Sequence, residues 1–348
     1  MTLTIEGQSA GPDEKTWLIA EVSANHDRDL DQALKLIDLA AEAGWDALKL
    51  QTYTADSLTM ESDHPSMAID PIWGRDRLYD LYDDAAMPME FHEPLFERAR
   101  AHGLVPFTSV YDPRDLPFVE DLGCPIYKIA SFEMTFDALL VEIAKTGKPV
   151  VMSTGMANLA EVDHAMEVLA RNNAREVMLL HCVSAYPAPL ASVNLHAIEI
   201  LRARYGDLIG FSDHTEGSRA ALTASAMGAV AIEKHITNDP DRTGPDHRFS
   251  ATPDILREIA DGVEEIHIAR GSSAKDTVSD EAGNKVVGRR SAFALQDLPK
   301  GHLLATGDFR FIRPGVGIPP NDPGAPLGRA LKNAVRKGHP ITYDDLAP

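Results

Sequence analysis

Short apolar segments alternate with helix-patterned segments over the first 270 residues, and this repeat is the strongest constraint on the fold. Runs rich in β-branched residues predict strands at residues 16–23, 46–51, 104–109, 126–131, 149–154, 176–182, 208–213 and 229–236. Apolar positions at helical spacing predict helices over residues 29–44, 90–102, 113–122, 136–145, 159–171, 195–205, 218–227 and 253–270. Continuous apolar strands separated by helices are typical of a parallel sheet that is covered on both faces.

This series of strand–helix units predicts an α/β fold of the (β/α)8 TIM-barrel type, whose usual length of about 250 residues is similar. An open, doubly wound sheet is the alternative. No GxGxxG phosphate-binding sequence follows the first predicted strand, which favours the barrel. Residues 53–88 interrupt the repeat, and a connection of this length is typical of an active-site lid.

A change of composition marks the end of the barrel. Residues 271–285 are rich in Gly, Ser, Asp and Lys, which predicts a linker between a barrel of residues 1–270 and a domain of residues 286–348. The last segment contains a near-repeat, LPKGHLLATGDF and VRKGHPITYDDL, and two related halves predict a small pseudo-symmetric β-rich domain. Because about 60 residues are marginal alone, we expect this domain to pack on the barrel or on a neighbouring subunit.

The charge and the cysteine content narrow the functional classes. The formal net charge is −20, which argues against a nucleic-acid-binding protein and against binding to anionic membranes. An anionic substrate would therefore need a local basic pocket. Cys124 and Cys182 do not form a metal-binding motif, and the sequence shows no signal peptide and no apolar run of about 18 residues. These features predict a cytoplasmic protein.

Polar side chains gather where the predicted strands end. The strand-end residues are Glu21, Asn25, Lys49, Gln51, Thr108, Ser109, Lys128, Ser131, Glu133, Ser153, Thr154, His181, Ser184, Tyr186, Ser212, Asp213, His214, Glu233, Lys234 and His235. The carboxyl ends of barrel strands converge on the active site of such enzymes. The sequence therefore predicts one polar site at this end of the barrel.

Two lysines in this set indicate an anion site. Lys49 and Lys128 each lie inside an apolar run, LKLQ and YKIAS, where a lysine must be paired or functional. Together with small hydroxyl groups they suit a phosphate and a carboxylate held together. The alternatives are that each lysine is an exposed strand-end residue, or that one forms a Schiff base as in barrel aldolases.

The remaining candidates are imidazoles and carboxylates. His214 and His235 end neighbouring strands, and two imidazoles with open positions suit a divalent ion such as Mn2+, acting as a Lewis acid on an aldehyde oxygen. Simple hydrogen-bonded histidines are the alternative. Glu21 is expected to transfer a proton or to stabilise a cationic intermediate, or else to orient Lys49. Glu133 and Asp246 are candidate ligands for sugar hydroxyls, or surface charges.

A resemblance to a known family covers nearly the whole chain. The runs IAEVSANH, ALKLQTYT, YKIASFE, STGM, HCVSAYPAP, GFSDHTEG, IEKHIT and GPDHRFS resemble the sialic acid synthases in order and spacing. The tail, with RRSAFA and FIRPGVGIPP, is similar to their antifreeze-like SAF domain. The resemblance implies a (β/α)8 barrel followed by a SAF domain. It also implies a transferase that condenses phosphoenolpyruvate with the open-chain aldehyde of a 2-acetamido sugar and releases phosphate.

The resemblance also implies a role for each matched residue. The implied ligands of phosphoenolpyruvate are Lys49, Ser109, Lys128, Ser131, Ser153, Ser184 and Ser212. The implied sugar-binding residues are Gln51, Glu133, Tyr186, Asp246 and Arg313. By the same resemblance Glu21 is the catalytic acid/base, Lys49 takes part in catalysis, and His214 and His235 hold the metal, Mn2+ first and Mg2+ or Co2+ as alternatives. Arg313 reaches the partner's barrel only in a homodimer with exchanged SAF domains.

Finer features resemble the pseudaminic acid synthases. These are SANH, LQTYT and the inserted segment, and they imply 2,4-diacetamido-2,4,6-trideoxy-L-altrose as the sugar. Two departures fall on the sugar side: TSVY, with Tyr111, stands where SSPF is usual, and AIDPIWG lacks the usual glycine pair before its Trp. The alternatives are the same reaction on N-acetylmannosamine or a legionaminic acid precursor, a Schiff-base lyase, and a non-catalytic carbohydrate-binding protein.

Overall fold

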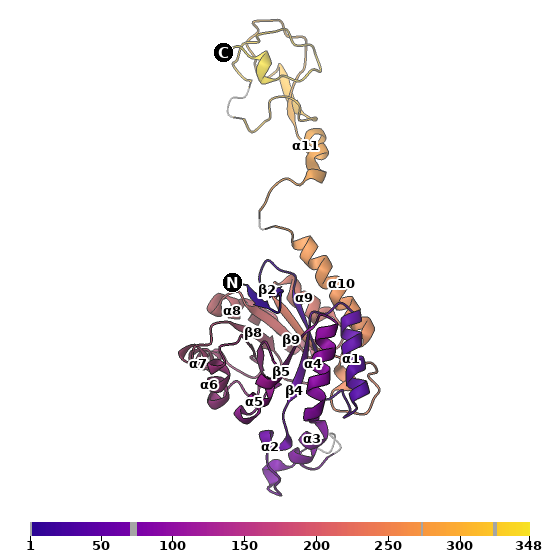
Figure 1. Cartoon of the computed structure of the whole chain (residues 1–348). Coiled ribbons are helices and arrows are strands. Elements are labelled where there is room, and N and C mark those ends of the chain that lie inside the picture. Colours follow the sequence, from indigo (N-terminus) through magenta and orange to yellow (C-terminus); the bar gives the residue numbers. More distant parts are fainter. Residues whose placement is uncertain (1, 70–74, 273, 323–325) are drawn as a thin grey trace. The chain divides into compact units, whose positions relative to one another are not determined.

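The chain divides into two compact units, Met1–Gly271 and Ser272–Pro348 (Figure 1). The computed structural model describes residues 2–69, 75–272, 274–322 and 326–348. Most of the sequence AIDPIWG falls on residues 70–74, outside the described residues. Within those described ranges, no helix combines the length and the hydropathy needed to cross a lipid bilayer.

The first unit contains a closed barrel of parallel strands (Figure 1). Its strands are β3 (Trp17–Glu21), β4 (Ala47–Thr52), β5 (Val105–Val110), β6 (Tyr127–Ile129), β7 (Val150–Ser153), β8 (Val177–Cys182), β9 (Ile209–Asp213) and β10 (Ala231–His235). Each strand pairs with the next one along the chain, and β10 pairs with β3 to close the ring, which places His235 opposite Glu21. The predicted (β/α)8 barrel is confirmed.

Helices follow the strands as the apolar spacing predicts. They are α1 (Leu30–Glu42), α4 (His92–Ala101), α5 (Leu116–Asp121), α6 (Asp137–Lys145), α7 (Leu159–Arg171), α8 (His196–Tyr205), α9 (Arg219–Ala226) and α10 (Pro253–Arg270). Helix α1 shows the local physics: Asp29 caps it by accepting hydrogen bonds from the amides of Asp31 and Gln32. Its buried face carries Leu36 and Ile37 against the barrel, and burial of such side chains stabilises the helix.

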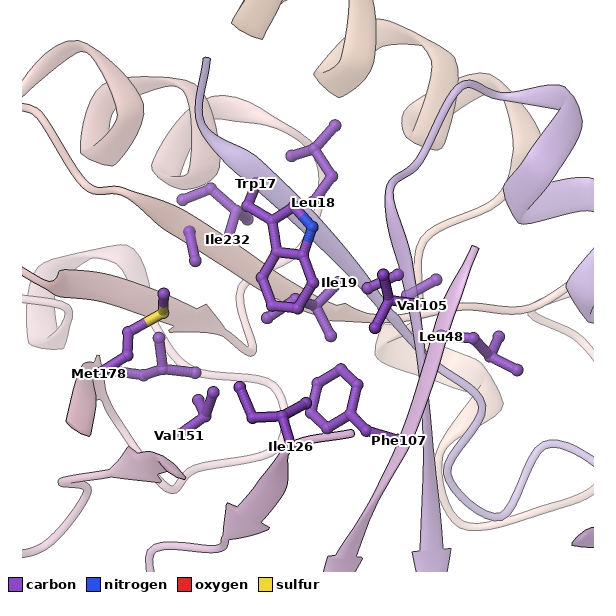
Figure 2. Packing of buried hydrophobic residues seen from close by; sticks show 14 of the residues in the cluster. Trp17, Leu18, Ile19, Leu48, Val105, Phe107, Ile126, Val151, Met178 and Ile232 are labelled. Atoms are coloured by element: carbon purple, nitrogen blue, oxygen red, sulfur yellow. The ribbon is translucent and has the colours of Figure 1, made fainter. Parts of the chain in front are cut away.

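The barrel interior changes from apolar to polar along the strands. Its amino-terminal part is filled by apolar side chains from several strands, as Figure 2 shows around Trp17, Phe107 and Met178. The rings of Trp17 and Phe107 stack with centroids 6.0 Å apart. Towards the carboxyl ends of the strands, the interior side chains are charged. Glu21 of β3 lies directly beside Lys49 of β4 in the strand pairing. The apolar part is therefore a packed floor that supports a polar site above it.

An amino-terminal hairpin was not predicted from the sequence. Strands β1 (Leu3–Ile5) and β2 (Gln8–Ala10) pair antiparallel, and Leu3 is fully buried in the barrel core. The Gln8 side chain accepts a hydrogen bond from Trp17 Nε1 at 2.8 Å and donates one to the carbonyl of Gly103 at 3.0 Å. Trp17 begins β3 and Gly103 lies just before β5. The hairpin therefore covers the amino-terminal end of the barrel.

The insertion of residues 53–88 folds into short helices. They are α2 (Ala55–Leu58), the 3-10 turn Pro65–Met67 and α3 (Leu78–Ala85), and α2 packs against α3. The guanidinium of Arg28, from the loop after β3, donates a hydrogen bond to the carbonyl of Asp83 at the end of α3. The insertion is therefore tied to the carboxyl end of the barrel, where a lid over the site is expected.

The second unit is a small β-rich fold. A helix, α11 (Ala282–Gly288), precedes the antiparallel strands β11 (Ser291–Ala294) and β12 (Phe309–Ile312). The two halves of the near-repeat meet at equivalent positions: Leu298 and Val335 exchange backbone hydrogen bonds of 2.8 and 2.9 Å. Leu304 and Ile341, also equivalent, are both buried in its core. The halves are therefore pseudo-symmetric, in agreement with the sequence pattern.

The packed floor of the barrel allows a stability test. Phe107→Ala removes a fully buried ring, and we expect it to lower the free energy of unfolding by about 3–5 kcal/mol. Ile200→Ala is the matched control, because this side chain is 50% exposed on α8 and should change stability by less than about 0.5 kcal/mol. Urea unfolding of the full chain measures both values. Equal losses for the two variants would contradict the assignment of the core.

Candidate active site at the carboxyl end of the barrel

A cavity of about 550 Å³ lies at the carboxyl ends of the barrel strands. The predicted site residues that line it are Lys49, Gln51, Lys128, Ser131, Glu133, Ser153, Tyr186, Ser212, His214, His235 and Asp246. Glu21 and Ser109 are not part of the lining, but both are fully buried and contact Lys49 Nζ. The structure therefore brings together most of the side chains that the strand-end pattern selects.

Two lysines and two glutamates form the base of the cavity. Lys49 Nζ makes an ion pair with Glu21 and lies 3.7 Å from Glu233 Oε2. Lys128 Nζ lies 3.8 Å from the same oxygen. Ser212 donates a hydrogen bond of 2.9 Å to the other oxygen of Glu233. The carboxylate of Glu233 is therefore shared between the two ammonium groups.

The pKa values of this cluster follow from burial and from the neighbouring charges. Burial, joined by the negative charge of Glu233, raises the pKa of Glu21 to about 7 despite the opposing effect of Lys49. For Glu233, burial also opposes ionisation, but Lys128 and Lys49 outweigh it and lower its pKa. Burial lowers the pKa of Lys128. At neutral pH Glu233 is therefore ionised, whereas Glu21 can both donate and accept a proton.

Hydroxyl groups and a backbone amide surround a small space next to this cluster. The amide of Gly155 donates a hydrogen bond of 3.0 Å to Ser131 Oγ. A Cβ atom at Gly155 would lie 2.3 Å from Ser184 Oγ and 2.8 Å from Ser131 Oγ, so a larger residue here would displace both hydroxyl groups. Ser153 Oγ is buried and has no hydrogen-bond partner within the described part of the chain. An unpaired hydroxyl donor beside lysines suits an oxygen of a phosphate or a carboxylate.

The two predicted histidines lie side by side. The rings of His214 and His235 are in an edge-on arrangement with centroids 5.3 Å apart. His214 Nδ1 donates to the carbonyl of Val183 at 3.0 Å, so Nε2 carries the lone pair whenever the ring is neutral. Burial opposes protonation of His214, but its hydrogen bond with Cys182 outweighs this effect and raises its pKa. Burial, and then the charge of His214, lowers the pKa of His235 well below its usual value, so this ring is neutral. Neutral imidazoles are the form that binds a metal ion.

The imidazole nitrogens of this pair and the nearby carboxylate of Asp246 suit a divalent metal ion. His235 Nδ1 is buried without a hydrogen-bond partner among the described residues, and it lies 3.8 Å from Asp246 Oδ2. Nitrogen donors with a nearby carboxylate suit a borderline ion such as Mn2+. Within the described ranges, no group of three or more His, Cys, Asp or Glu side chains is placed to hold a metal. Further ligands of an ion at this position would therefore be water or substrate oxygens.

Ser23 forms hydrogen bonds with both Glu21 and Asp246. Ser23 has a positive φ of 51°, which is uncommon for a residue with a side chain. Its amide donates a hydrogen bond of 2.8 Å to Glu21 Oε1, and its hydroxyl donates to Asp246 Oδ2. The turn after β3 therefore holds Glu21 and Asp246 in fixed positions on either side of Ser23.

Aromatic rings line the outer part of the cavity. Tyr186 packs on His214 with centroids 4.4 Å apart. Tyr53 contacts Tyr111 edge-on at 5.2 Å and Tyr82 of the insertion at 6.3 Å. Burial raises the pKa of Glu133 to about 7, although Lys128 opposes this effect. These rings and Glu133 provide a wall that is suited to a neutral, partly apolar ligand.

Some strand-end residues point away from the site, and these correct the expectation that all of them converge. Asp213 and Lys234 form a buried ion pair of 2.7 Å outside the cavity lining. Thr108 hydrogen-bonds Thr52, and His181 donates to the carbonyl of Val193 at 2.7 Å. The reason is the alternation of side chains along a strand, which directs every second residue to the helices.

The same alternation places two further residues in the site: Glu233, which was predicted only as a strand-end residue without a role, and Cys182, which was not predicted there. Glu233 is two residues before His235, and Cys182 is two residues before Ser184, so each shares the inward face of its strand. Cys182 lines the cavity, with Sγ 3.7 Å from His214 Nδ1. Arg313 lies in the second unit, at the Arg313–Pro314 bond that follows β12.

Comparison with known proteins agrees with this geometry. Residues 36–275 match the model of the NeuB family, and residues 289–347 match that of the SAF domain. A pseudaminic acid synthase of Campylobacter jejuni is 35% identical over 96% of this chain and 97% of its own length. An N,N'-diacetyllegionaminic acid synthase of the same species is 34% identical over 88% of this chain and 92% of its own.

A solved structure shows the same fold. The N-acetylneuraminic acid synthetase of Leptospira borgpetersenii superposes with a TM-score of 0.74 at 30% identity, over 82% of this chain and 95% of the other. The match to the family model and the similarity over nearly the full length of the relatives lead to one conclusion. The chain belongs to the NeuB family and carries a carboxyl-terminal SAF domain.

Proposed function

We propose that this chain is a metal-dependent synthase that joins phosphoenolpyruvate to the open-chain aldehyde of an N-acetylated amino sugar. One observation carries the proposal: a single cavity holds the Lys49–Glu233–Lys128 cluster, the unpaired hydroxyl of Ser153 and a neutral imidazole ring. The similar synthases of pseudaminic and legionaminic acid support the same reaction class. The product is a nine-carbon sugar acid, and the enzyme is a transferase.

In this reaction the cationic and hydroxyl groups hold phosphoenolpyruvate. The proposed ligands are Lys49, Ser109, Lys128, Ser131, Ser153, Ser184 and Ser212. Carbon 3 of the enol attacks the aldehyde carbon, and the aldehyde oxygen takes up a proton. Water then adds to the cationic carbon 2 and loses a proton. Last, the hydroxyl on carbon 2 loses its proton and becomes the ketone oxygen while the bond from carbon 2 to the phosphate oxygen breaks, so phosphate leaves with that oxygen.

Glu21 is the proposed acid/base. Its side chain is fully buried, paired with Lys49 and hydrogen-bonded by Gln51 Nε2 at 3.2 Å, so it stands next to the ligands of both substrates. A carboxyl whose pKa is about 7 can accept the proton of the attacking water and can stabilise the cation at carbon 2. A divalent ion held by His214 and His235, Mn2+ or else Mg2+ or Co2+, would supply polarisation of the aldehyde oxygen.

The proposed sugar is 2,4-diacetamido-2,4,6-trideoxy-L-altrose, bound by Gln51, Glu133, Tyr186 and Asp246. Two of these side chains have a carboxylate, which can accept two hydrogen bonds from sugar hydroxyls. A precursor of legionaminic acid or N-acetylmannosamine is the alternative with the same mechanism, because relatives with different products have nearly equal identity to this chain. Phosphate release with a panel of these sugars and Mn2+ tests the choice.

Assembly and location belong to the same proposal. We propose a cytoplasmic homodimer in which residues 286–348 of each chain, after a linker of residues 271–285, cover the partner's barrel. Arg313 would then contact an N-acetyl group of the sugar. A Schiff-base lyase is a second candidate, because burial lowers the pKa of Lys128 and so favours a nucleophilic amine. Borohydride in the presence of pyruvate traps a lyase and leaves the synthase unmodified.

The imidazole pair gives the first test. His214→Ala or His235→Ala should weaken Mn2+ binding at least about tenfold and abolish metal-dependent phosphate release, because each removes a proposed ligand. Titration calorimetry with Mn2+ gives the affinity without any substrate. His196→Ala is the control, since this side chain is 82% exposed on α8 and should bind Mn2+ like the original protein. Unchanged Mn2+ affinity in both active-site variants would refute the metal role.

The pKa of Glu21 gives the second test. If the ionised form acts, kcat should rise with pH and level off above about 7, because the raised pKa delays ionisation to that range. Glu21→Gln should remove this inflection and lower kcat roughly 10²- to 10⁴-fold. Glu133→Gln is the matched control, since the pKa of Glu133 is also raised to about 7. The account fails if Glu133→Gln removes the inflection and Glu21→Gln keeps it.

A further inference from the structure

The apolar part of the cavity lining has two sources, the loops that follow the barrel strands and the insertion. The loops contribute Ala24, Ala130, Phe132 and Pro245. Strand ends of the barrel supply the charged, hydroxyl and imidazole groups. The insertion, in the part that the structure describes, supplies Leu58, Leu81 and Ala85 together with the rings of Tyr53 and Tyr82. Leu58, Leu81 and Ala85 have no polar side-chain atom, so they cannot satisfy a buried hydroxyl group. The insertion therefore contributes a largely hydrocarbon wall to the cavity.

In the proposed reaction, this wall would face the end of the sugar that does not react. The proposed anion site and the imidazole pair fix the reacting aldehyde carbon near the strand ends. The terminal carbon of an open-chain hexose lies at the opposite end of its carbon chain. Helices α2 and α3 follow the end of β4 and pack on each other, and Arg28 ties α3 to the loop after β3. In this pose the insertion meets the carbon of the sugar that lies farthest from the aldehyde.

We propose that Leu58, Leu81 and Ala85 are specificity-determining residues that receive a terminal methyl group and so select 6-deoxy sugars over sugars with a terminal hydroxymethyl group. The proposal rests on the condensing function proposed above and adds the residues that choose its sugar. A methyl group gains free energy when it leaves water for this wall. A hydroxymethyl group would lose a hydrogen bond to water without a replacement from these three side chains.

The lost hydrogen bond of the terminal hydroxyl sets how strongly the enzyme should prefer the 6-deoxy sugar. A buried hydroxyl without a partner is disfavoured enough to lower kcat/KM roughly ten- to one-hundred-fold. Two substrates that differ only at the terminal carbon isolate this effect. These are 2,4-diacetamido-2,4,6-trideoxy-altrose and 2,4-diacetamido-2,4-dideoxy-altrose, and the same pair can be made from 2-acetamido-mannose and its 6-deoxy form.

The experiment measures phosphate release with each sugar of a pair, at saturating phosphoenolpyruvate and with Mn2+. The original protein should prefer the 6-deoxy sugar by about ten- to one-hundred-fold in kcat/KM. Leu81→Asn or Leu58→Asn should reduce this ratio at least about fivefold, because the new amide can hydrogen-bond the terminal hydroxyl. A ratio of kcat/KM values is insensitive to a loss of folded enzyme, so a purely structural defect would leave it unchanged.

Leu190→Asn is the matched control, because Leu190 is 58% exposed and does not line the cavity. Its ratio should equal that of the original protein. The inference is overturned if both sugars of a pair react equally well, or if the two wall variants keep the original ratio while turnover persists. Absence of phosphate release with every sugar would instead reject the proposed function, so the two failures are distinguishable.

Discussion

The site depends on one buried interaction: the carboxylate of Glu233 lies between the ammonium groups of Lys49 and Lys128. Two lysines inside a barrel would repel each other and would lose their hydration. Both effects are offset here because Glu233 and Glu21 supply opposite charge at short range. The cluster is therefore assembled before any substrate arrives. An anion that enters the cavity meets two ammonium groups that the fold already holds close together, so binding does not have to pay for arranging them.

The rest of the fold keeps this cluster in place. The apolar half of the barrel, capped by the amino-terminal hairpin, leaves no room for the lysine side chains to move towards the core. Ser23, with its left-handed backbone, fixes Glu21 and Asp246. The absence of a side chain at Gly155 leaves space for the hydroxyl groups of Ser131 and Ser184. A substitution at Ser23 or Gly155 would disturb the site, because Ser23 depends on its left-handed backbone and Gly155 on the absence of a side chain.

The sequence was informative about the barrel for a physical reason. Strand and helix periods differ, so the alternation of the two patterns predicted every barrel strand and the helix after it within a few residues. The near-repeat predicted the pseudo-symmetric tail in the same way. The hairpin was missed because Leu3–Ile5 and Gln8–Ala10 are too short to show a period, and their stability comes from contacts with distant residues such as Trp17. Lys49, Glu233 and His235 were predicted from their strand-end positions. The place of Glu233 between the lysines and the cavity-facing side of Cys182 required the inward register of each strand.

The most direct measurement of the central claim is the affinity for phosphoenolpyruvate of Lys49→Met, Lys128→Met and the double variant, determined by titration calorimetry. Circular dichroism verifies that each variant is folded, and Lys148→Met is the control because Lys148 pairs with Glu120 on the exterior of the barrel. The account predicts that each single change weakens binding at least about tenfold, and that the two losses are not additive, since both lysines contact one anion and share Glu233. Unchanged affinity in either single variant would contradict it.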